Sequence, residues 1–500
     1  MARRGVGAVS PLAAPVELLP DPRGIIAGER VEHGGSGTHT HVYAATGRPT
    51  TEVPLAGAVE MDGAVGAAAA AGGRWRRLPA SGRRDALLAL GRLIARDAER
   101  LVPLQTLESG IPRQFAAPVP GAAADFFAYY AGWADKVGGE VIETWPVRAL
   151  DYAREEPYGV VAVIVPWNAP LASLSQIVAA ALAAGNTVVL KPPELAPFTA
   201  LRVGELALEA GLPAGALNVV PAGPEGGAAL VAHPGVDKVH FTGSGATARE
   251  VLAGAQGNLT PVALELGGKS AQLVFADANL RAAARQVLSG LVIYSGQGCA
   301  NGTRVLVQDT VYEELVELAL SRLRSVRVGD PLAAGTMVGP VISEQACARI
   351  LALIERARAD GHGRLLAGGE RLEGELGEGF FIAPTVFGEV DHDTELAQRE
   401  IFGPVLSFLP FATEEEAIRL ANATDYGLAA YIHTRDVSRA HRVAHELQAG
   451  NVWVNGFFGV PPSMPFGGVK ESGQGRVGGL AGLREFLRTK NVWVELGSGR

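Results

Sequence analysis

The chain has 500 residues, of which 48% are hydrophobic and 19% are charged, and its formal net charge is −8 at pH 7. A chain of this length exceeds what one hydrophobic core usually organises, so we expect two or three domains. The acidic balance gives no general attraction to phosphate backbones or anionic lipids, so we expect neither nucleic-acid nor membrane partners.

The first twenty residues place two arginines before a weakly apolar run, which resembles a secretory signal. Pro11, Pro15 and Glu17 interrupt the apolar centre, so we expect no export. The chain has only two cysteines, Cys299 and Cys347, which cannot form a disulfide framework. These observations favour a reducing, cytoplasmic location.

The segment up to about residue 50 is rich in glycine, proline and threonine and contains His33, His39 and His41. Because no cysteine or carboxylate cluster stands nearby at ligand spacing, we expect a loop with short strands and no metal site. From Met61 to Gly138 the apolar residues recur at helical spacing, which predicts several packed helices.

Short β-branched runs then alternate with helical segments. Strands are predicted at 160–165, 187–190, 217–220 and 237–241, with helices in the gaps, and this alternation is typical of a parallel, doubly wound sheet. A second alternating stretch runs from 270 to about 431. The sequence therefore predicts an α/β fold with two doubly wound parallel-sheet lobes.

The C-terminal run NVWVEL, residues 491–496, alternates like a strand but has no obvious partner nearby in the sequence. An unpaired apolar edge favours association, so we expect this strand to pair across a subunit boundary.

Cys299 is the first candidate for chemistry, because it lies between Gly298 and Ala300 in YSGQGCANG, where small neighbours let a substrate approach the sulfur. A single cysteine is more often a small buried hydrophobe, so both interpretations stay open at this point. Cys347, in the helical run EQACARI, is interpreted as structural.

Glu265 follows an apolar strand and precedes two glycines in LELGGKS. It could be a general base with a raised pKa or a solvated strand end. A third interpretation comes from GSGATA at 243–248, a Gly-x-Gly-x-x-Ala pattern, with Glu265 binding a ribose about twenty residues later. We disfavour it, because that pattern belongs after the first strand of such a sheet and this one follows the fourth.

Asn168 lies in VAVIVPWNAP, just after a predicted buried strand and before a helix. Open α/β sheets bind ligands at such positions, and an amide there can donate to a developing oxyanion. The same position suits a helix N-cap, which is the alternative.

Seven motifs occur in an order that resembles the aldehyde dehydrogenase superfamily, from about Gly24 to about Leu496. They are PWN, KPPE, FTGS, LELGGKS, GQGCA, REIFGPV and PFGGVKESGQGR. The resemblance implies oxidation of an aldehyde to a carboxylic acid with NAD. Cys299 would be the nucleophile, Asn168 and the Cys299 backbone N–H would hold the oxyanion, and Glu265 would activate water to hydrolyse the thioester.

The resemblance also implies a cofactor site in which Lys191 and Glu194 hold the adenosine ribose. The Glu194 carboxylate would repel a 2′-phosphate, so NAD is favoured over NADP. The expected cofactor-binding residues are Val165, Pro166, Trp167, Lys191, Glu194, Gly223, Gly243, Ser244, Leu266, Gly267, Glu400 and Phe402.

The chain departs from the family pattern at two places. FTGSGATA replaces the usual FTGSTEVG, so Ala246 and Ala248 are not assigned as ligands, and PWNAP replaces PWNFP. Small residues follow at Ala172 and Ser173, which implies a wide tunnel for a branched, cyclic or long-chain aldehyde. The expected substrate-lining residues are Ala169, Ser173, Ile293 and Phe466.

The resemblance further implies a dinucleotide-binding domain at 1–137 and 157–266, a catalytic domain at 267–470, and a small β oligomerisation element at 138–156 and 471–500. A homodimer or homotetramer is expected. Two alternatives remain: a coenzyme A acylating dehydrogenase or thioester hydrolase on the same scaffold, and a non-catalytic NAD-binding protein.

Overall fold

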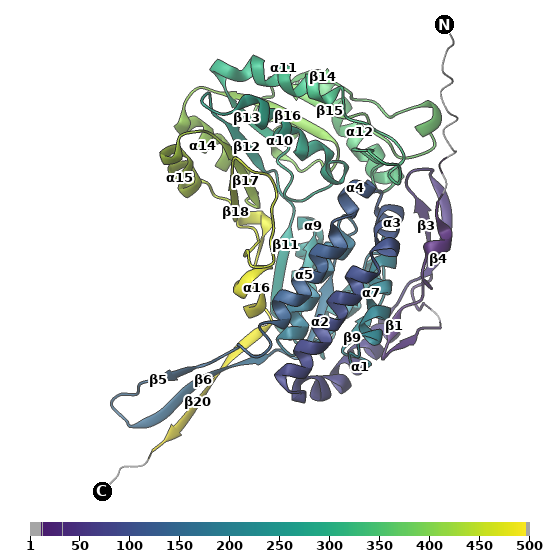
Figure 1. The fold of residues 1–500 in the computed structure, drawn as a ribbon, viewed down its shortest axis with the longest axis vertical. Helices are drawn as coiled ribbons and strands as arrows, with labels where there is room; N and C mark the ends of the chain where they lie inside the picture. The colour runs from purple at the N-terminus through teal and green to yellow at the C-terminus, as the bar shows by residue number, and fades with distance from the viewer. Residues whose placement is uncertain (1–11, 13, 33, 497–500) are drawn as a thin grey trace.

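Two large sheets and a projecting arm organise the computed structural model, which describes residue 12, residues 14–32 and residues 34–496 (Figure 1). Most of the signal-like N-terminal segment and His33 lie outside the described residues. None of the helices in the described ranges combines the length and hydropathy needed to cross a membrane.

The first sheet has eight strands in the order β19-β11-β10-β7-β8-β9-β1-β2. The central strands β7 to β11 run parallel, and β1, β2 and β19 pair antiparallel at the edges. The strands are β1 (Ile25–Ile26), β2 (Glu29–Arg30), β7 (Val160–Ile164), β8 (Thr187–Lys191), β9 (Leu217–Val219), β10 (Lys238–Gly243), β11 (Val262–Leu266) and β19 (Gly473–Gln474).

Alternating side chains of β7 are buried on opposite faces of this sheet, as expected of a strand covered on both sides. Val161 and Val163 pack with helices α2, α3 and α5 to α7, whereas Val160, Ala162 and Ile164 pack with α1, α8 and α9. The helices are α1 (Ala58–Arg77), α2 (Ala80–Arg96), α3 (Ala98–Ser109), α4 (Arg113–Ala116), α5 (Val119–Ala131), α6 (Pro170–Ala183), α7 (Phe198–Glu209), α8 (Pro224–Val231) and α9 (Gly245–Ala255).

The second sheet has seven strands in the order β14-β15-β16-β13-β12-β17-β18, all parallel except β14. Its strands are β12 (Ala271–Val274), β13 (Arg304–Gln308), β14 (Arg364–Ala367), β15 (Thr385–Gly388), β16 (Val405–Phe411), β17 (Ala429–His433) and β18 (Asn451–Val454). The helices of this lobe are α10 (Leu280–Val292), α11 (Tyr312–Leu323), α12 (Glu344–Ala359), α13 (Glu395–Gln398), α14 (Glu414–Asn422) and α15 (Val437–Glu446). The prediction of two doubly wound lobes is confirmed.

The arm is a three-stranded antiparallel sheet of β5 (Glu140–Ile142), β6 (Ala149–Pro157) and β20 (Leu487–Glu495), which follows α16 (Gly479–Arg484) (Figure 1). Every residue of β20 pairs with β6 of the same chain, so the strand has a partner within the chain that the sequence did not indicate. Because β20 is the edge strand of this sheet, pairing of its other edge across a subunit boundary stays a prediction. Its partner lies more than 300 positions earlier, and no local pattern in the sequence indicates so distant a pairing.

The N-terminal histidine segment forms the hairpin of β3 (Thr38–Tyr43) and β4 (Arg48–Pro54). His41 is buried, its ring lies edge-on to Phe198 at 4.9 Å, and its Nδ1 lies 2.6 Å from the Thr50 hydroxyl. Burial lowers its pKa to about 4. His41 is therefore a core residue of the hairpin.

Helices α3 and α7 are joined by the buried carboxylate of Glu108. It accepts the backbone N–H groups of Phe198 at 2.7 Å and Thr199 at 3.1 Å, where α7 begins without a capping side chain of its own. The first N–H groups of a helix need such partners, and the positive end of the helix dipole favours a carboxylate there. Glu108 thus acts as an N-terminal cap supplied by another helix.

We predict that Glu108→Ala destabilises the protein by about 2–3 kcal/mol, because two buried N–H groups lose their acceptor. Glu108→Gln keeps one acceptor oxygen and should cost less. Denaturation followed by circular dichroism measures both variants, and equal stability of wild type and Glu108→Ala would contradict this role.

Candidate active site

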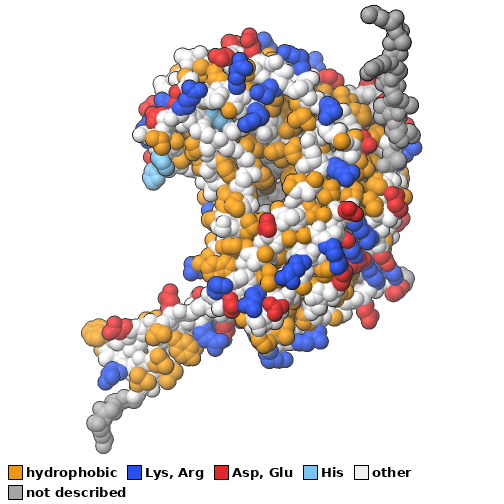
Figure 2. All heavy atoms as spheres, viewed as in Figure 1, with side chains coloured by type: hydrophobic (Ala, Val, Ile, Leu, Met, Phe, Trp, Pro, Cys, Tyr) orange, Lys and Arg blue, Asp and Glu red, His pale blue; other side chains and the backbone are white. Residues whose placement is uncertain are grey.

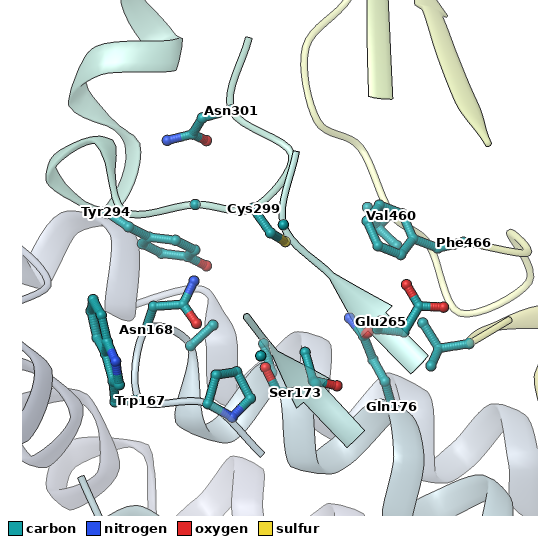
Figure 3. A pocket seen from close by; sticks show the side chains of 18 of the residues that line it. Trp167, Asn168, Ser173, Gln176, Glu265, Tyr294, Cys299, Asn301, Val460 and Phe466 are labelled. Atoms are coloured by element: carbon teal, nitrogen blue, oxygen red, sulfur yellow. The ribbon is translucent and has the colours of Figure 1, made fainter. Parts of the chain in front are cut away.

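A cavity of about 620 Å³ opens between the two lobes (Figure 3). It lies at the carboxyl ends of β7, β10 and β11, where parallel α/β sheets bind their ligands. Helices α4 to α6 line one side, and the segments around Cys299, Glu400 and Phe466 line the others. The cavity therefore draws its wall from residues far apart in the sequence.

Cys299 lies in the cavity wall on the loop that leads into β13. Two glycines allow this loop to fold tightly. A Cβ on Gly296, whose φ is +76°, would lie 2.1 Å from the Gly403 carbonyl oxygen, and one on Gly298 would lie 2.6 Å from the Asn301 amide oxygen. The glycine setting noted in the sequence is thus a packing requirement of the loop that presents the thiol.

The Cys299 thiol has its pKa raised to about 12, first by burial and then by the negative charges of Glu400 and Glu265. The backbone N–H groups of Ala300 and Cys299 act in the opposite direction. The thiol is therefore protonated at neutral pH, and it needs a proton acceptor before it can act as a nucleophile.

Asn168 is buried in the same wall, and its side-chain amide donates to the Gln297 carbonyl at 2.7 Å. Helix α6 begins after Ala169 and has no side-chain cap, so Asn168 does not act as its N-cap. An amide nitrogen has two hydrogens, and the bond to Gln297 uses one of them. Figure 3 shows Asn168 facing the same part of the cavity as Cys299.

Glu265 is the second-last residue of β11 and is only 5% exposed, which rules out a solvated strand end. Neither carboxylate oxygen has a hydrogen-bond partner among the described residues. Burial raises the pKa of Glu265 well above its usual value, Glu485 adds to the increase, and Arg476 opposes it. Its carboxylate lines the cavity together with Cys299, as a general base for the thiol or for water requires (Figure 3).

Glu400 reaches the segment after β11 from the second lobe, where it accepts the Gly268 N–H at 3.0 Å. Burial raises the pKa of Glu400 to about 7, although the Gly268 N–H and the charges of Lys269 and Arg349 lower it. Phe402, with φ +56°, places its ring edge-on to Trp167 at 5.4 Å. Glu400, Phe402 and Trp167 all line the cavity.

The remaining predicted cofactor residues follow the carboxyl ends of neighbouring strands. Lys191 ends β8 and lies 3.8 Å from the Glu194 carboxylate, Gly223 precedes α8, and Ser244 caps α9 by accepting the Thr247 N–H. Helix N-termini and a lysine–carboxylate pair along one sheet edge suit the phosphates and ribose of a dinucleotide.

The structure divides the predicted cofactor residues into two groups. Those that line the cavity are Pro166, Trp167, Gly243, Ser244, Leu266, Gly267, Glu400 and Phe402. Those that lie outside its lining are Val165, which is buried directly after β7, and Lys191, Glu194 and Gly223, which lie at or after the ends of β8 and β9. Among the described residues, no group of three or more His, Cys, Asp or Glu side chains could hold a metal ion.

Three of the four predicted substrate-lining residues, Ala169, Ser173 and Phe466, line the cavity, but Ile293 does not. Ile293 packs against the core beside α10 and α11, and the next residue, Tyr294, lines the cavity instead. Tyr294 and Ser295 both have left-handed backbone conformations, with φ of 53° and 56°, which turn the chain between Ile293 and Tyr294. In the sequence of that segment, only Gly296 indicates a turn.

Sequence reasoning also missed Tyr431 on β17. Its hydroxyl donates to the Ala300 carbonyl at 2.8 Å, and its ring stacks on Phe457 at 4.6 Å and on Trp453 at 5.2 Å. Tyr431 therefore fixes the residue after Cys299 against the loop that carries Phe458 and Val460 of the cavity wall. It stands in a plain buried strand, which gives no signal of this role.

Comparisons with known proteins identify the family of the chain. Residues 31–492 match the model of the aldehyde dehydrogenase family. Human retinal dehydrogenase 2 is 40% identical, and the match covers 97% of this chain and 96% of that protein. A betaine aldehyde dehydrogenase from Staphylococcus aureus, solved in complex with NAD+, is 35% identical with a TM-score of 0.94 and 97% of each chain covered. A mutant aldehyde dehydrogenase from Bacillus cereus is 37% identical, with a TM-score of 0.94 and coverage of 98% of this chain and 100% of that one. The chain therefore belongs to the aldehyde dehydrogenase family.

Proposed function

We propose that this aldehyde dehydrogenase oxidises its substrate to a free carboxylic acid with NAD, using Cys299 as the nucleophile and Glu265 as the base for hydrolysis. The observation that supports this most strongly is that a thiol lines one cavity with the oriented amide of Asn168 and with a carboxylate that has no hydrogen-bond partner among the described residues. Each group alone has another interpretation, but together they supply a nucleophile, a base and an oxyanion donor.

NAD suits the residues along the edge of the first sheet. The N-termini of α8 and α9 favour a pyrophosphate, Glu194 can accept ribose hydroxyls and would repel a 2′-phosphate, and Glu400 with Phe402 borders the nicotinamide end of the cavity. When bound, NAD accepts the hydride that leaves the substrate carbon. NADP is less favoured because the Glu194 carboxylate would repel its 2′-phosphate.

The first half of the reaction forms the bond between sulfur and carbon. The thiol proton passes to water, and Sγ adds to the aldehyde carbon to form a thiohemiacetal. The free amide hydrogen of Asn168 and the Cys299 N–H stabilise the oxygen as it becomes negative. Loss of hydride from the same carbon then leaves a thioester on Cys299.

The second half hydrolyses this thioester. Glu265 takes a proton from water, the resulting hydroxide adds to the thioester carbon, and the sulfur leaves as the thiolate, releasing the acid. A buried carboxylate with a raised pKa is a stronger base than a solvated one. This assignment disfavours acyl transfer to coenzyme A, in which no water-activating carboxylate is needed. Because the reactive groups are assembled, it also disfavours a non-catalytic NAD-binding protein.

The three-part organisation expected from the sequence, with domains at 1–137 and 157–266, at 267–470, and at 138–156 with 471–500, stays our proposal. The arm exposes large apolar side chains, including Val141 at 80% and Trp145 at 90% (Figure 2). Exposed apolar surface on a projecting sheet favours association with a second subunit. We therefore propose a homodimer or homotetramer that associates through the arm. The proposed location stays the cytoplasm, as the two cysteines of the sequence favour.

Replacing Cys299 with alanine should abolish NADH formation, because no other group on the cavity wall can form the thioester. Cys347→Ala is the matched control, since that cysteine lies in the buried core of the second lobe. The measurement is NADH fluorescence with an aldehyde panel, alongside NAD binding by calorimetry. Turnover retained in Cys299→Ala, or a need for added coenzyme A in the wild type, would contradict the mechanism.

The steady-state rate should rise with pH over the range in which Glu265 loses its proton, because Glu265 must be deprotonated to act as a base. This range lies above that of an ordinary glutamate, since burial raises the pKa of Glu265. Glu265→Gln should retain an initial burst of NADH and lose most of the subsequent turnover. Stopped-flow fluorescence across this pH range separates the two phases. If Glu265→Gln keeps the wild-type steady-state rate, Glu265 is not the base that activates water.

Val141→Asp should weaken subunit association, because it places a charge on the apolar face of the arm. Val59→Asp is the control, since Val59 on α1 is also 80% exposed but lies outside the arm. Size-exclusion chromatography with light scattering gives the mass of each. A monomeric wild type, or equal masses of the two variants, would refute the role of the arm.

A further inference from the structure

We infer that the site is specialised for a bulky, uncharged aldehyde with a hydrocarbon tail, and that alanines on α5 and α6 set this preference. The inference rests on the proposed function and concerns the half of the cavity that holds the substrate. It follows from three features of the wall: its composition, the hydrogen bonds and roles that already occupy its charged groups, and the size of its side chains.

Hydrocarbon surfaces make up most of the substrate half. From α4, α5 and α6 come Phe115, Val119, Phe126 and Ile177, and the segment after β18 adds Phe458 and Val460. Figure 2 shows hydrophobic side chains around the hollow between the lobes on the face where α4 and α5 lie. Such walls stabilise an apolar tail by removing it from water.

Each charged group of the cavity already has a hydrogen-bond partner or a role in the proposed chemistry. Among the lining residues that the structure describes, only Glu265, Glu400 and Arg349 carry charged groups. Glu265 serves the chemistry, Glu400 accepts the Gly268 N–H, and Arg349 donates to the Ile401 carbonyl at 2.8 Å. No charged side chain therefore faces the tail from α4, α5 or α6, and an ionic tail would lose its hydration without a partner.

On α6, two polar side chains interrupt the apolar wall, Ser173 and Gln176. They are three positions apart and so share one face of the helix. Figure 3 shows Gln176 directed toward the part of the cavity beside Cys299 and Glu265. Polar groups there meet the reacting carbonyl or water, so they do not require a polar tail.

Several side chains in this wall are small. Ala122 and Ala123 on α5 and Ala169 and Ala172 at the start of α6 leave space that larger residues would fill. The whole cavity holds about 620 Å³, which the nicotinamide and the substrate share. A substrate of two carbons would leave much of this apolar volume unfilled, whereas a branched or ring-bearing tail would occupy it.

The test compares kcat/KM of the NAD-loaded enzyme for five aldehydes: acetaldehyde, citral, cinnamaldehyde, succinic semialdehyde and betaine aldehyde. We expect kcat/KM for citral or cinnamaldehyde to exceed that for each of the other three by at least about tenfold. Burial of a few extra carbons in an apolar pocket gives a difference of this size. In Ala122→Phe, the ratio of citral to acetaldehyde should fall by at least about tenfold, because the new ring occupies the tail space.

Ala128→Phe is the matched control, since Ala128 is also exposed on α5 but does not line the cavity, and its ratio should equal that of the wild type. A preference for acetaldehyde or for the anionic or quaternary ammonium tail, with turnover intact, would overturn this inference and leave the proposed function standing. An equal fall of the ratio in both variants would also overturn it. Failure to oxidise any of the five with NAD would instead refute the proposed function.

Discussion

A carboxylate buried without a hydrogen-bond partner is the feature on which this site depends. Glu265 is 5% exposed, and neither of its oxygens has a hydrogen-bond partner in the part of the chain that the structure describes. This arrangement costs folding free energy that a solvated or paired carboxylate would not. The backbone keeps Glu265 in place, because β11 is paired with β10 on one side and β19 on the other. The same desolvation that raises its pKa makes it a stronger base, so the cost to stability and the gain in reactivity have one cause.

Two segments from later in the chain hold the residues after β11 in place. Glu400 accepts the Gly268 N–H, and the Ser472 hydroxyl donates to the Gly267 carbonyl at 2.7 Å. A Cβ on Gly267 would lie 2.1 Å from a Glu400 oxygen, so this contact requires glycine there. The short segment after Glu265 is thus held from both sides, which fixes the base relative to the loop of Cys299. Tyr431 holds that loop through its hydrogen bond to the Ala300 carbonyl.

The sequence predicted the two lobes well, because β-branched runs such as 160–164 and 187–191 are buried on both faces of a sheet and stand out between helices. It also indicated Cys299, Glu265 and Asn168, whose neighbours are glycines or strand ends. It failed where long-range packing or backbone conformation determines which residues come together. Pairing of β20 with β6 joins distant segments, and the left-handed turn at Tyr294 exchanges which side chain faces the cavity. Tyr431 acts through one hydroxyl in an ordinary strand, and only the folded chain brings it to Ala300.

The central claim is that an acyl group is carried on Cys299 and released by water that Glu265 activates. Intact-protein and peptide mass spectrometry of Glu265→Gln, after mixing with NAD and an aldehyde, tests this most directly. The account predicts that the acyl-thioester accumulates, with a mass gain equal to the aldehyde less two hydrogens, on the peptide containing Cys299 and not on the one containing Cys347. An NADH burst without an adduct on Cys299, or an adduct on another residue, would contradict it.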